Sequence, residues 1–449
     1  MGGSPSTESP IGIGFRPELA AEILRSAPAI GCLELLLEER LSSAARAREG
    51  EALAEMFPVV VHGTKLSLGS AAGIDRSRAR RLGDFARRTR AFAVTEHAAF
   101  VRAGGVEIGH LSPVPFSMEA VRVVAANVAA ARRELPDVPL YLENVAWPLR
   151  PPGDAMAEAD FYAELCRATG CGLLLDLGNL LANAQNAGRD PFLELERFPV
   201  EEARMIHIAG SVVRGGFTYD THAHATPRAV FGLLRAAVPR CGVVPIVLER
   251  DHGFDWGEVR GEMGRARDAA LACDARPRSG SPPALARSTD DDALGFADER
   301  GLAEEQEAFA RALAGLDDDP RFDAAGIARA REILARKRVE EALPLLPRLG
   351  AHHAAVEIAE AHVARSVRPS RAAPLADARA IAEAAERDLG LRDAATLDRL
   401  ALEARFRFDA AGASPRRAPW VGSAVLSHGR SWVFKGLGET ASVHIFNHP

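Results

Sequence analysis

Short apolar segments alternate with amphipathic, helix-compatible segments through the first 270 residues of this 449-residue chain. Continuous apolar runs of four to eight residues are typical of the buried strands of a parallel sheet. The segments between them, such as SMEAVRVVAANVAAARREL, have the apolar spacing of helices. The predicted strands cover residues 11–15, 32–38, 59–63, 93–97, 140–144, 172–177, 205–209 and 243–249.

This alternation predicts an α/β fold, and more specifically a (β/α)8 TIM barrel, which needs eight strand–helix units in roughly 250 residues. A doubly wound sheet is the competing arrangement, and it usually carries a glycine-rich phosphate loop after its first strand. The residues that follow the first predicted strand begin GFRPEL and contain no such loop. We therefore expect the barrel to occupy residues 11–272.

Residues that can bind metal ions stand at the ends of six predicted strands. A barrel brings the carboxyl ends of its strands to one rim, where active sites lie. The cluster YDTHAH adds an Asp and a His two positions apart, which would face the same way in an extended chain. Because burying so many ionisable groups without a cation is costly, we predict that they bind metal. The predicted ligands are His62, His97, Glu143, Asp176, His207, Asp220, His222 and Glu249.

Eight ligands exceed what one tetrahedral ion uses, so we expect two or three ions that share carboxylates. Cysteine is missing from the set, which argues against a structural zinc site or an iron–sulfur cluster. Taken singly, a histidine such as His62 is more often structural, and Glu249 could pair with Arg250 next to it. We assign no catalytic residue beyond the metal ligands. Other candidates for site or substrate contacts are His110, His224 and His252.

The chain changes character after residue 272. Residues 273–298 are rich in Pro, Ser, Gly and Asp and are predicted to be a linker. Residues 299–413 have the pattern of a helical domain, and 414–449 alternate apolar residues with glycine turns, as in a β-like tail. Residues 1–10 are predicted to be a disordered tail.

Charge and cysteine content restrict the setting in which the chain works. The formal net charge of −6 gives no electrostatic reason to expect nucleic acid or a membrane as partner. No apolar stretch approaches the roughly 18 residues of a membrane span, and the start MGGSPSTESP lacks the features of a signal peptide. The five cysteines are scattered, which suits a reducing compartment, so we predict a cytoplasmic protein.

A series of motifs over about residues 10–270 resembles those of the multinuclear non-heme iron-dependent oxidative enzymes, a family that includes the methanobactin-biosynthesis oxidase. In chain order the motifs are GIGFRPE, VVHGTKLSLG, TEH, HLSPVPFSMEAV, LENVAW, GCGLLLDLGNLLANAQNAG, IHIAG, DTHAH and LERD. The resemblance implies an oxidoreductase with two or three irons, mixed Fe(II) and Fe(III), and O2 as co-substrate. It places the iron ligands on the eight metal-binding residues named above.

The resemblance also implies the reaction, which is oxidation of a cysteine in a ribosomally synthesised precursor peptide, a step of RiPP biosynthesis. Members of the family commonly need a leader-binding partner. Residues 299–449 could be such a partner fused in the same chain, and the alternative is a stabilising or oligomerising appendage. Asn179 matches a motif position. Leu177 and Gly178 follow Asp176 where the family often has Asn-Asn, and Ser211 stands where it often has His. These departures bear on the number of irons and on the reaction.

Two other functions are compatible with the same residues. One is a divalent-metal TIM barrel of the isomerase or endonuclease-like hydrolase type, which would use zinc, manganese or magnesium and no O2. The other is a non-catalytic metal-binding scaffold, in which the barrel mouth would be closed. Metal identity and dependence on O2 separate the three.

Overall fold

The computed structural model describes residues 10–272, 300–366, 372–410, 412–427, 429–438 and 442–448. The predicted linker and the predicted N-terminal tail, apart from Pro10, lie outside the described residues. The chain divides into two compact units. The first is formed by Met1–Val101 and Leu111–Glu304, and the second by Arg102–His110 and Glu305–Pro449.

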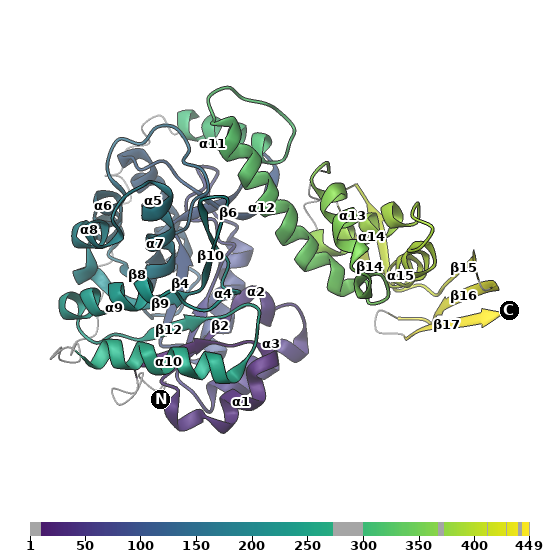
Figure 1. Cartoon of the computed structure of the whole chain (residues 1–449), viewed down its shortest axis with the longest axis horizontal. Helices are drawn as coiled ribbons and strands as arrows, with labels where there is room; N and C mark the ends of the chain where they lie inside the picture. Colours follow the sequence, from purple (N-terminus) through teal and green to yellow (C-terminus); the bar gives the residue numbers. More distant parts are fainter. Residues whose placement is uncertain are drawn as a thin grey trace. The chain divides into compact units, whose positions relative to one another are not determined.

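A closed barrel of parallel strands forms the centre of the first unit (Figure 1), which confirms the predicted fold. Around the barrel the strand order is β1-β12-β9-β8-β7-β4-β3-β2, and β1 closes it by pairing with both β2 and β12. The barrel strands are β1 (Ile11–Gly14), β2 (Leu33–Leu36), β3 (Val59–His62), β4 (Ala93–His97), β7 (Leu140–Glu143), β8 (Gly172–Asp176), β9 (Ala203–Ala209) and β12 (Ile246–Glu249).

Helices surround the barrel, and their ends follow local sequence signals. Asp75 caps α4 by accepting hydrogen bonds from the backbone N–H groups of Ser77 and Arg78. Gly170 ends α6 in the left-handed conformation (φ 61°), which glycine adopts without strain. The helices of this unit are α1 (Ala20–Arg25), α2 (Leu37–Arg40), α3 (Ala44–Ala54), α4 (Arg76–Thr89), α5 (Met118–Arg132), α6 (Glu158–Thr169), α7 (Leu177–Asn186), α8 (Pro191–Arg197), α9 (Arg228–Cys241) and α10 (Trp256–Leu271).

The barrel interior is built in two layers, an apolar one below a polar one. Because strand side chains alternate with a period of two, residues two positions further along a strand face the same interior. The apolar layer comprises Cys32, Val60, Ala93, Tyr141, Leu174, Met205 and Val247. Two positions further on, the buried polar residues are Glu34, His62, Thr95, Glu143, Asp176, His207 and Glu249.

Two antiparallel hairpins, which the sequence did not predict, extend from loops after barrel strands. β5 (Ala99–Ala103) and β6 (Val106–Pro113) follow β4, and the tip of this hairpin belongs to the second unit. β10 (Ser211–Arg214) and β11 (Phe217–Asp220) follow β9. His110 therefore lies on strand β6.

The second unit is helical with small sheets, as predicted, and has its own apolar core, which includes Leu346, Ile381 and Leu391. A separate apolar cluster joins α15 to the sheet of β15, β16 and β17 through Leu400 and Val433. Its elements are α11 (Arg300–Leu313), α12 (Ala324–Ala342), α13 (Ala354–Val363), α14 (Ala373–Ala385), α15 (Arg392–Arg405), β13 (Phe406–Asp409), β14 (Gly412–Pro415), β15 (Trp420–Leu426), β16 (Gly429–Lys435) and β17 (Val443–His448).

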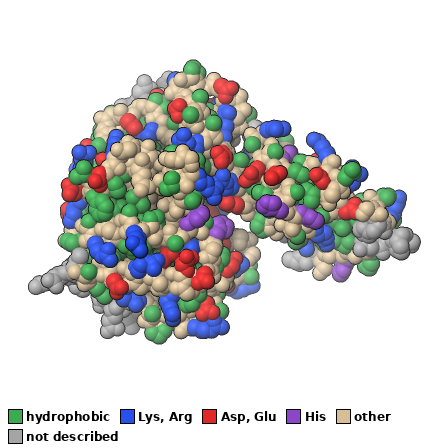
Figure 2. All heavy atoms as spheres, in the orientation of Figure 1, with side chains coloured by type: hydrophobic (Ala, Val, Ile, Leu, Met, Phe, Trp, Pro, Cys, Tyr) green, Lys and Arg blue, Asp and Glu red, His purple; other side chains and the backbone are tan. Residues whose placement is uncertain are grey.

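The surface in view in Figure 2 mixes charges of both signs with scattered apolar side chains. On this face, mixed charges of both signs create no large field of one sign. Among the described helices, none combines the length and the apolar character that crossing a bilayer requires.

Candidate metal centre

The strand ends bring six of the eight predicted ligands together inside the barrel. Five of them are the last residues of their strands, and the sixth, His207, lies two residues before the end of β9. All six are buried. Their ligand atoms form two groups that share Glu143, and within each group the atoms lie within 4.8 Å of one another.

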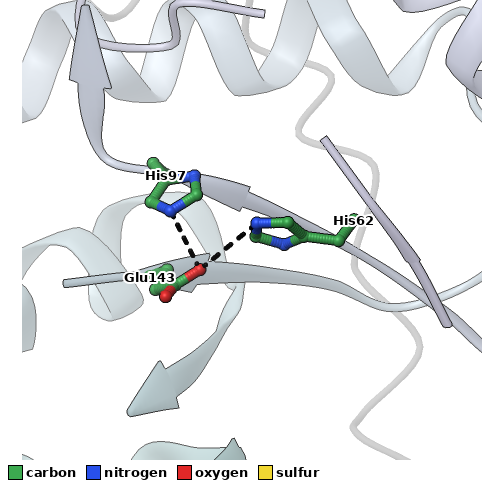
Figure 3. Close-up of side chains that lie close together, drawn as sticks. All are labelled: His62, His97 and Glu143. Atoms are coloured by element: carbon green, nitrogen blue, oxygen red, sulfur yellow. Dashed lines mark ion pairs between the residues drawn. The ribbon is translucent and has the colours of Figure 1, made fainter. Parts of the chain in front are cut away.

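The first group consists of His62, His97 and Glu143. Glu143 Oε2 lies 3.2 Å from His97 Nε2 and 3.8 Å from His62 Nε2, so one carboxylate oxygen faces both rings (Figure 3). Two ligand atoms that each lie about 2.1 Å from one ion are separated by about 3 Å at ordinary coordination angles. The group therefore has the spacing of ligands to a common cation.

The second group consists of Glu143, Asp176, His207 and Glu249. His207 Nδ1 lies 3.3 Å from Glu143 Oε1 and 3.1 Å from Glu249 Oε2. Glu143 thus directs one oxygen to each group. A carboxylate in this position can bridge two metal ions.

Asp220 and His222 flank the second group on its more exposed side. His222 Nε2 lies 3.0 Å from Asp220 Oδ2, and His222 Nδ1 lies 3.5 Å from Glu249 Oε2. The expectation that these residues stand on an extended chain was wrong for His222, which has a left-handed backbone (φ 52°). Its N–H donates to Gly210 O, and its carbonyl accepts from Asp251 N. Such a strained conformation is retained only where surrounding bonds hold it.

The donor set fits divalent cations better than it fits a purely structural network. Buried polar atoms normally have hydrogen-bond partners. Within the described residues, several atoms that face the two groups form no hydrogen bond of suitable geometry, although ionisable groups lie within 4 Å of some of them. They are Glu143 Oε2, Asp176 Oδ2, His207 Nδ1, Asp220 Oδ1, His222 Nε2 and Glu249 Oε2. A set of nitrogen and carboxylate donors without sulfur suits iron, zinc and manganese.

The protonation of the two first-group histidines differs. Burial, opposed by the Glu143 carboxylate and reinforced by His97, lowers the pKa of His62 to about 3. Burial also lowers the pKa of His97, but the carboxylates of Glu143 and Glu96 outweigh it and raise that pKa to about 9. Without metal, a proton therefore resides on His97.

The carboxylates of the second group also perturb one another. Burial, together with the nearby carboxylates of Glu143 and Asp220, raises the pKa of Asp176 well above its usual range. Burial raises the pKa of Glu249 too, but His207 and His222 outweigh this effect and hold it well below its usual range. Bound cations would stabilise all of these carboxylates in their charged form.

Sequence reasoning missed two buried residues that contact the predicted ligands. Glu34 Oε2 lies 2.8 Å from His207 Nε2, and Thr95 Oγ1 lies 2.8 Å from His62 Nδ1. Both belong to the polar interior layer. A polar residue within an apolar strand, two positions after a core residue, is the sequence signal that could have identified them.

Arg250 does not pair with Glu249, although the two are adjacent in sequence. Its guanidinium instead donates to Glu258 at 3.2 Å and to Glu262 at 2.5 Å. Nearby, Arg16 Nε donates to Asp251 at 3.0 Å. Glu249 is therefore left facing His207 and His222.

The other predicted contacts lie outside the two groups. Asn179 is next to the second group, because its N–H donates to Asp176 Oδ1 at 2.7 Å, while its own Oδ1 has no partner among the described residues. Ser211 pairs with Asp220 in the hairpin. His224 Nδ1 lies 2.9 Å from Thr221 Oγ1. His252 is exposed. His110 belongs to the second unit, where it lies 3.1 Å from Lys337 Nζ.

Together, the closed barrel and the carboxylate–histidine groups at its strand ends define a TIM barrel with a candidate multinuclear metal site. The matching family model covers residues 10–270 and is described as "RiPP precursor modification enzyme MbnB/TglH/ChrH". The chain belongs to this family, which confirms the resemblance found in the sequence.

Several curated relatives carry the name UPF0276 protein. One from Streptomyces avermitilis is 38% identical over 264 residues, which are 57% of this chain and 54% of that protein. This chain thus spans about half the length of that relative. One from Caulobacter vibrioides is 37% identical over 242 residues, which are 54% of this chain and 86% of the relative.

Solved structures with similar folds are more distant. A xylose isomerase domain protein from Planctomyces limnophilus is 15% identical with a TM-score of 0.40, and the match covers 59% of this chain and 99% of that one. Endonuclease IV from Thermus thermophilus is 20% identical with a TM-score of 0.39, over 57% of this chain and 98% of that one. Likenesses of this size carry no information about the reaction.

Proposed function

We propose that this protein is an iron- and O2-dependent oxidoreductase that modifies cysteine in a ribosomally synthesised precursor peptide. The observation that carries the proposal is the pair of ligand groups sharing Glu143, with their buried, unpartnered donor atoms. Membership of a family of precursor-modifying enzymes supports the substrate class.

The residues of the two groups would hold two irons about the shared carboxylate of Glu143. His62 and His97 would bind the first ion, while Asp176, His207 and Glu249 would bind the second. Iron held in this way supplies one-electron redox chemistry with O2, which side chains alone do not provide. Asp220 and His222 would bind a third ion or face the substrate.

Side-chain exposure indicates where a peptide would enter. The side chains of Glu143 and His207 are 2% and 0% exposed, whereas those of Asp220 and His222 are 20% and 19% exposed. The apolar interior layer lies on the opposite side of the ligand groups and closes the barrel there. We therefore place the substrate cysteine on the side of Asp220 and His222, with water excluded from the side of the apolar layer.

The second unit would bind the leader segment of the precursor. Its separate apolar core supports this role, because a peptide-binding domain needs a stable surface of its own. A binding domain fused to the catalytic barrel raises the effective concentration of the tethered peptide. The cysteine would then reach the metal centre without needing high affinity there.

The test is to purify the full chain without O2 and to measure its metal content and Mössbauer spectrum. We expect two or three irons per chain, and an O2-dependent change in the mass of a leader-containing peptide that carries a C-terminal cysteine. The substrate would be a peptide of this kind that is encoded by a short reading frame next to the gene for this protein. The same peptide with Ser in place of Cys is the control.

The alternative functions predict different results. A divalent-metal isomerase or hydrolase would hold zinc, manganese or magnesium at full occupancy and would turn over without O2. A metal-binding scaffold would hold metal but leave every candidate peptide unchanged. Either result, with no iron-dependent reaction, would overturn the proposal.

A further inference from the structure

Glu34 is a buried carboxylate beside the ligand groups that belongs to neither of them. It lies on β2, with 3% of its surface exposed, and its Oε2 is 2.8 Å from His207 Nε2. β2 and β9 are not neighbours in the barrel, because β1 and β12 separate them on one side. Glu34 therefore contacts His207 across the barrel interior.

The two nitrogens of His207 have different surroundings. Nε2 faces the single carboxylate of Glu34, whereas Nδ1 faces Glu143 Oε1 and Glu249 Oε2 at 3.3 and 3.1 Å. A carboxylate accepts only, so an ionised Glu34 requires that Nε2 carry the hydrogen. When His207 is neutral, as a metal ligand must be, that tautomer leaves a lone pair on Nδ1, directed at two carboxylate oxygens.

A lone pair facing carboxylate oxygens is unfavourable unless a proton or a metal ion lies between them, and a metal ion that binds there displaces the proton. Nδ1 of His207 and Oε2 of Glu249 have no hydrogen-bond partner among the described residues, as a position between ligands requires. In many metal sites, a carboxylate accepts a hydrogen bond from the ring nitrogen of a histidine that does not bind the metal. This hydrogen bond fixes the tautomer of the histidine and makes its other nitrogen a stronger metal ligand.

We propose that Glu34 is a positioning residue that selects Nδ1 of His207 as a metal-binding atom. This inference rests on the proposed metal centre but concerns a residue outside its ligand set. The other two histidines of the ligand groups lack an equivalent partner. His62 Nδ1 contacts the neutral hydroxyl of Thr95 at 2.8 Å, and His97 Nδ1 lies 3.6 Å from Glu96 Oε2, too far for a hydrogen bond.

A purely structural ion pair is the competing explanation. It would need no particular tautomer, and replacing such a buried pair by residues of similar size is often neutral for stability. The interior layering favours the positioning role. Glu34 occupies on β2 the level that ligands occupy on β3, β7, β8, β9 and β12, two positions after the apolar layer.

The test compares Fe(II) binding by the full-length wild-type chain and by Glu34→Gln, measured without O2 by competition with a chelator. We expect Glu34→Gln to fold normally and to lose roughly 10- to 100-fold in affinity for one equivalent of metal, the range for removal of such a partner. Thr95→Val is the matched control. It removes the hydroxyl that contacts His62. The affinity for the metal ion bound by His207 should stay unchanged.

A spectroscopic measurement on the wild-type chain needs no variant to fold. With Zn(II) as a diamagnetic probe and 15N-labelled histidine, His207 should show a solvent-protected proton on Nε2 and a metal-bound Nδ1. The His207→Gln spectrum assigns the signal. A proton on Nδ1, or metal on Nε2, would overturn the inference.

The inference would also be overturned if a folded Glu34→Gln chain kept its Fe(II) affinity. It would likewise be overturned if the affinities for all bound ions fell by the same factor. These outcomes leave the proposed metal centre intact, because the wild-type chain still binds metal. A wild-type chain that binds no divalent ion would remove the centre and this inference together.

Discussion

Glu143 is the residue on which both ligand groups depend. Its two oxygens face different groups, with Oε2 directed at His62 and His97 and Oε1 at His207. The side chain is 2% exposed, so its charge would be costly to bury without nearby cations. Substitutions at single ligands should therefore affect the metals unequally.

We predict that Glu143→Ala loses metal from both groups, whereas His97→Ala and Asp176→Ala each lose one equivalent and keep the other. The reason is that Glu143 is shared, while His97 and Asp176 each belong to one group. Metal analysis after anaerobic loading measures the difference. Glu55→Ala is the control, since the side chain of Glu55 is 67% exposed and its surface ion pair is worth little. Full metal content in Glu143→Ala would contradict the shared role.

We also predict that metal affinity rises with pH. The pKa of His97 is raised to about 9 by Glu143 and Glu96 against the effect of burial, so metal must displace a proton from His97 below that pH. Affinity at the first group should fall about tenfold for each pH unit below 9, that is, about 100-fold from pH 8 to pH 6. His62, with its pKa lowered to about 3, adds nothing in this range.

Metal-binding isotherms at several pH values, with proton release measured in two buffers of different ionisation enthalpy, test this dependence. The displaced proton should appear in the buffer when the first group fills. Affinity that stays constant between pH 6 and pH 8 would contradict a protonated His97.

At the scale of elements, the hairpin of β10 and β11 and the turn after it carry Asp220 and His222 to the proposed metal centre. The turn passes so close to β9 that a Cβ atom on Gly210 would lie 1.7 Å from His224 O. Only glycine leaves room for this approach. The position of His222 therefore depends on Gly210, although Gly210 has no side chain that could bind a metal ion.

We predict that Gly210→Ala displaces this turn, lowers the free energy of unfolding by about 1–3 kcal/mol, and weakens metal binding on the side of His222. Gly264→Ala is the matched control. Gly264 lies within α10 with nothing near its Cβ position, so alanine there should raise helix stability by up to about 1 kcal/mol. Denaturant unfolding and metal-binding isotherms measure both effects. Equal behaviour of the two variants would contradict the role of Gly210.

The barrel and the strand ends could be predicted because apolar runs and their terminal polar residues are local features of the sequence. Glu34 could not be identified with equal ease, because it lies within the run CLELLLE and its partner His207 is 173 residues away. The left-handed backbone of His222 depends on contacts with Gly210 and Asp251, which no local pattern encodes. The hairpin of β5 and β6 was missed for a similar reason, since its tip packs in another unit.

At the scale of the whole molecule, the second unit is assembled from two distant stretches of chain, Arg102–His110 and Glu305–Pro449. Within it, Ile108 is 5% exposed and lines a small cavity with Leu313, Leu334 and Val363. Removing the C-terminal stretch would leave Ile108 without these neighbours.

We predict that a chain truncated after Ala272 still binds metal but is less soluble than the full-length protein. The ligand groups lie entirely in the first unit, whereas the hairpin tip would expose apolar surface. Metal content and the fraction of soluble protein measure the two effects. Ile108→Ser in the truncated chain should recover solubility, and no recovery would show that other surfaces cause the loss.

The divided origin of the second unit also sets an order of events during synthesis. The hairpin tip, which ends at His110, leaves the ribosome about 190 residues before α11, which begins at Arg300 and enters the same unit. At roughly 5–20 residues per second, this interval lasts on the order of ten to forty seconds. The barrel can thus form its polar interior before the partner helices of the hairpin are synthesised. Metal loading of the proposed centre can then precede assembly of the second unit.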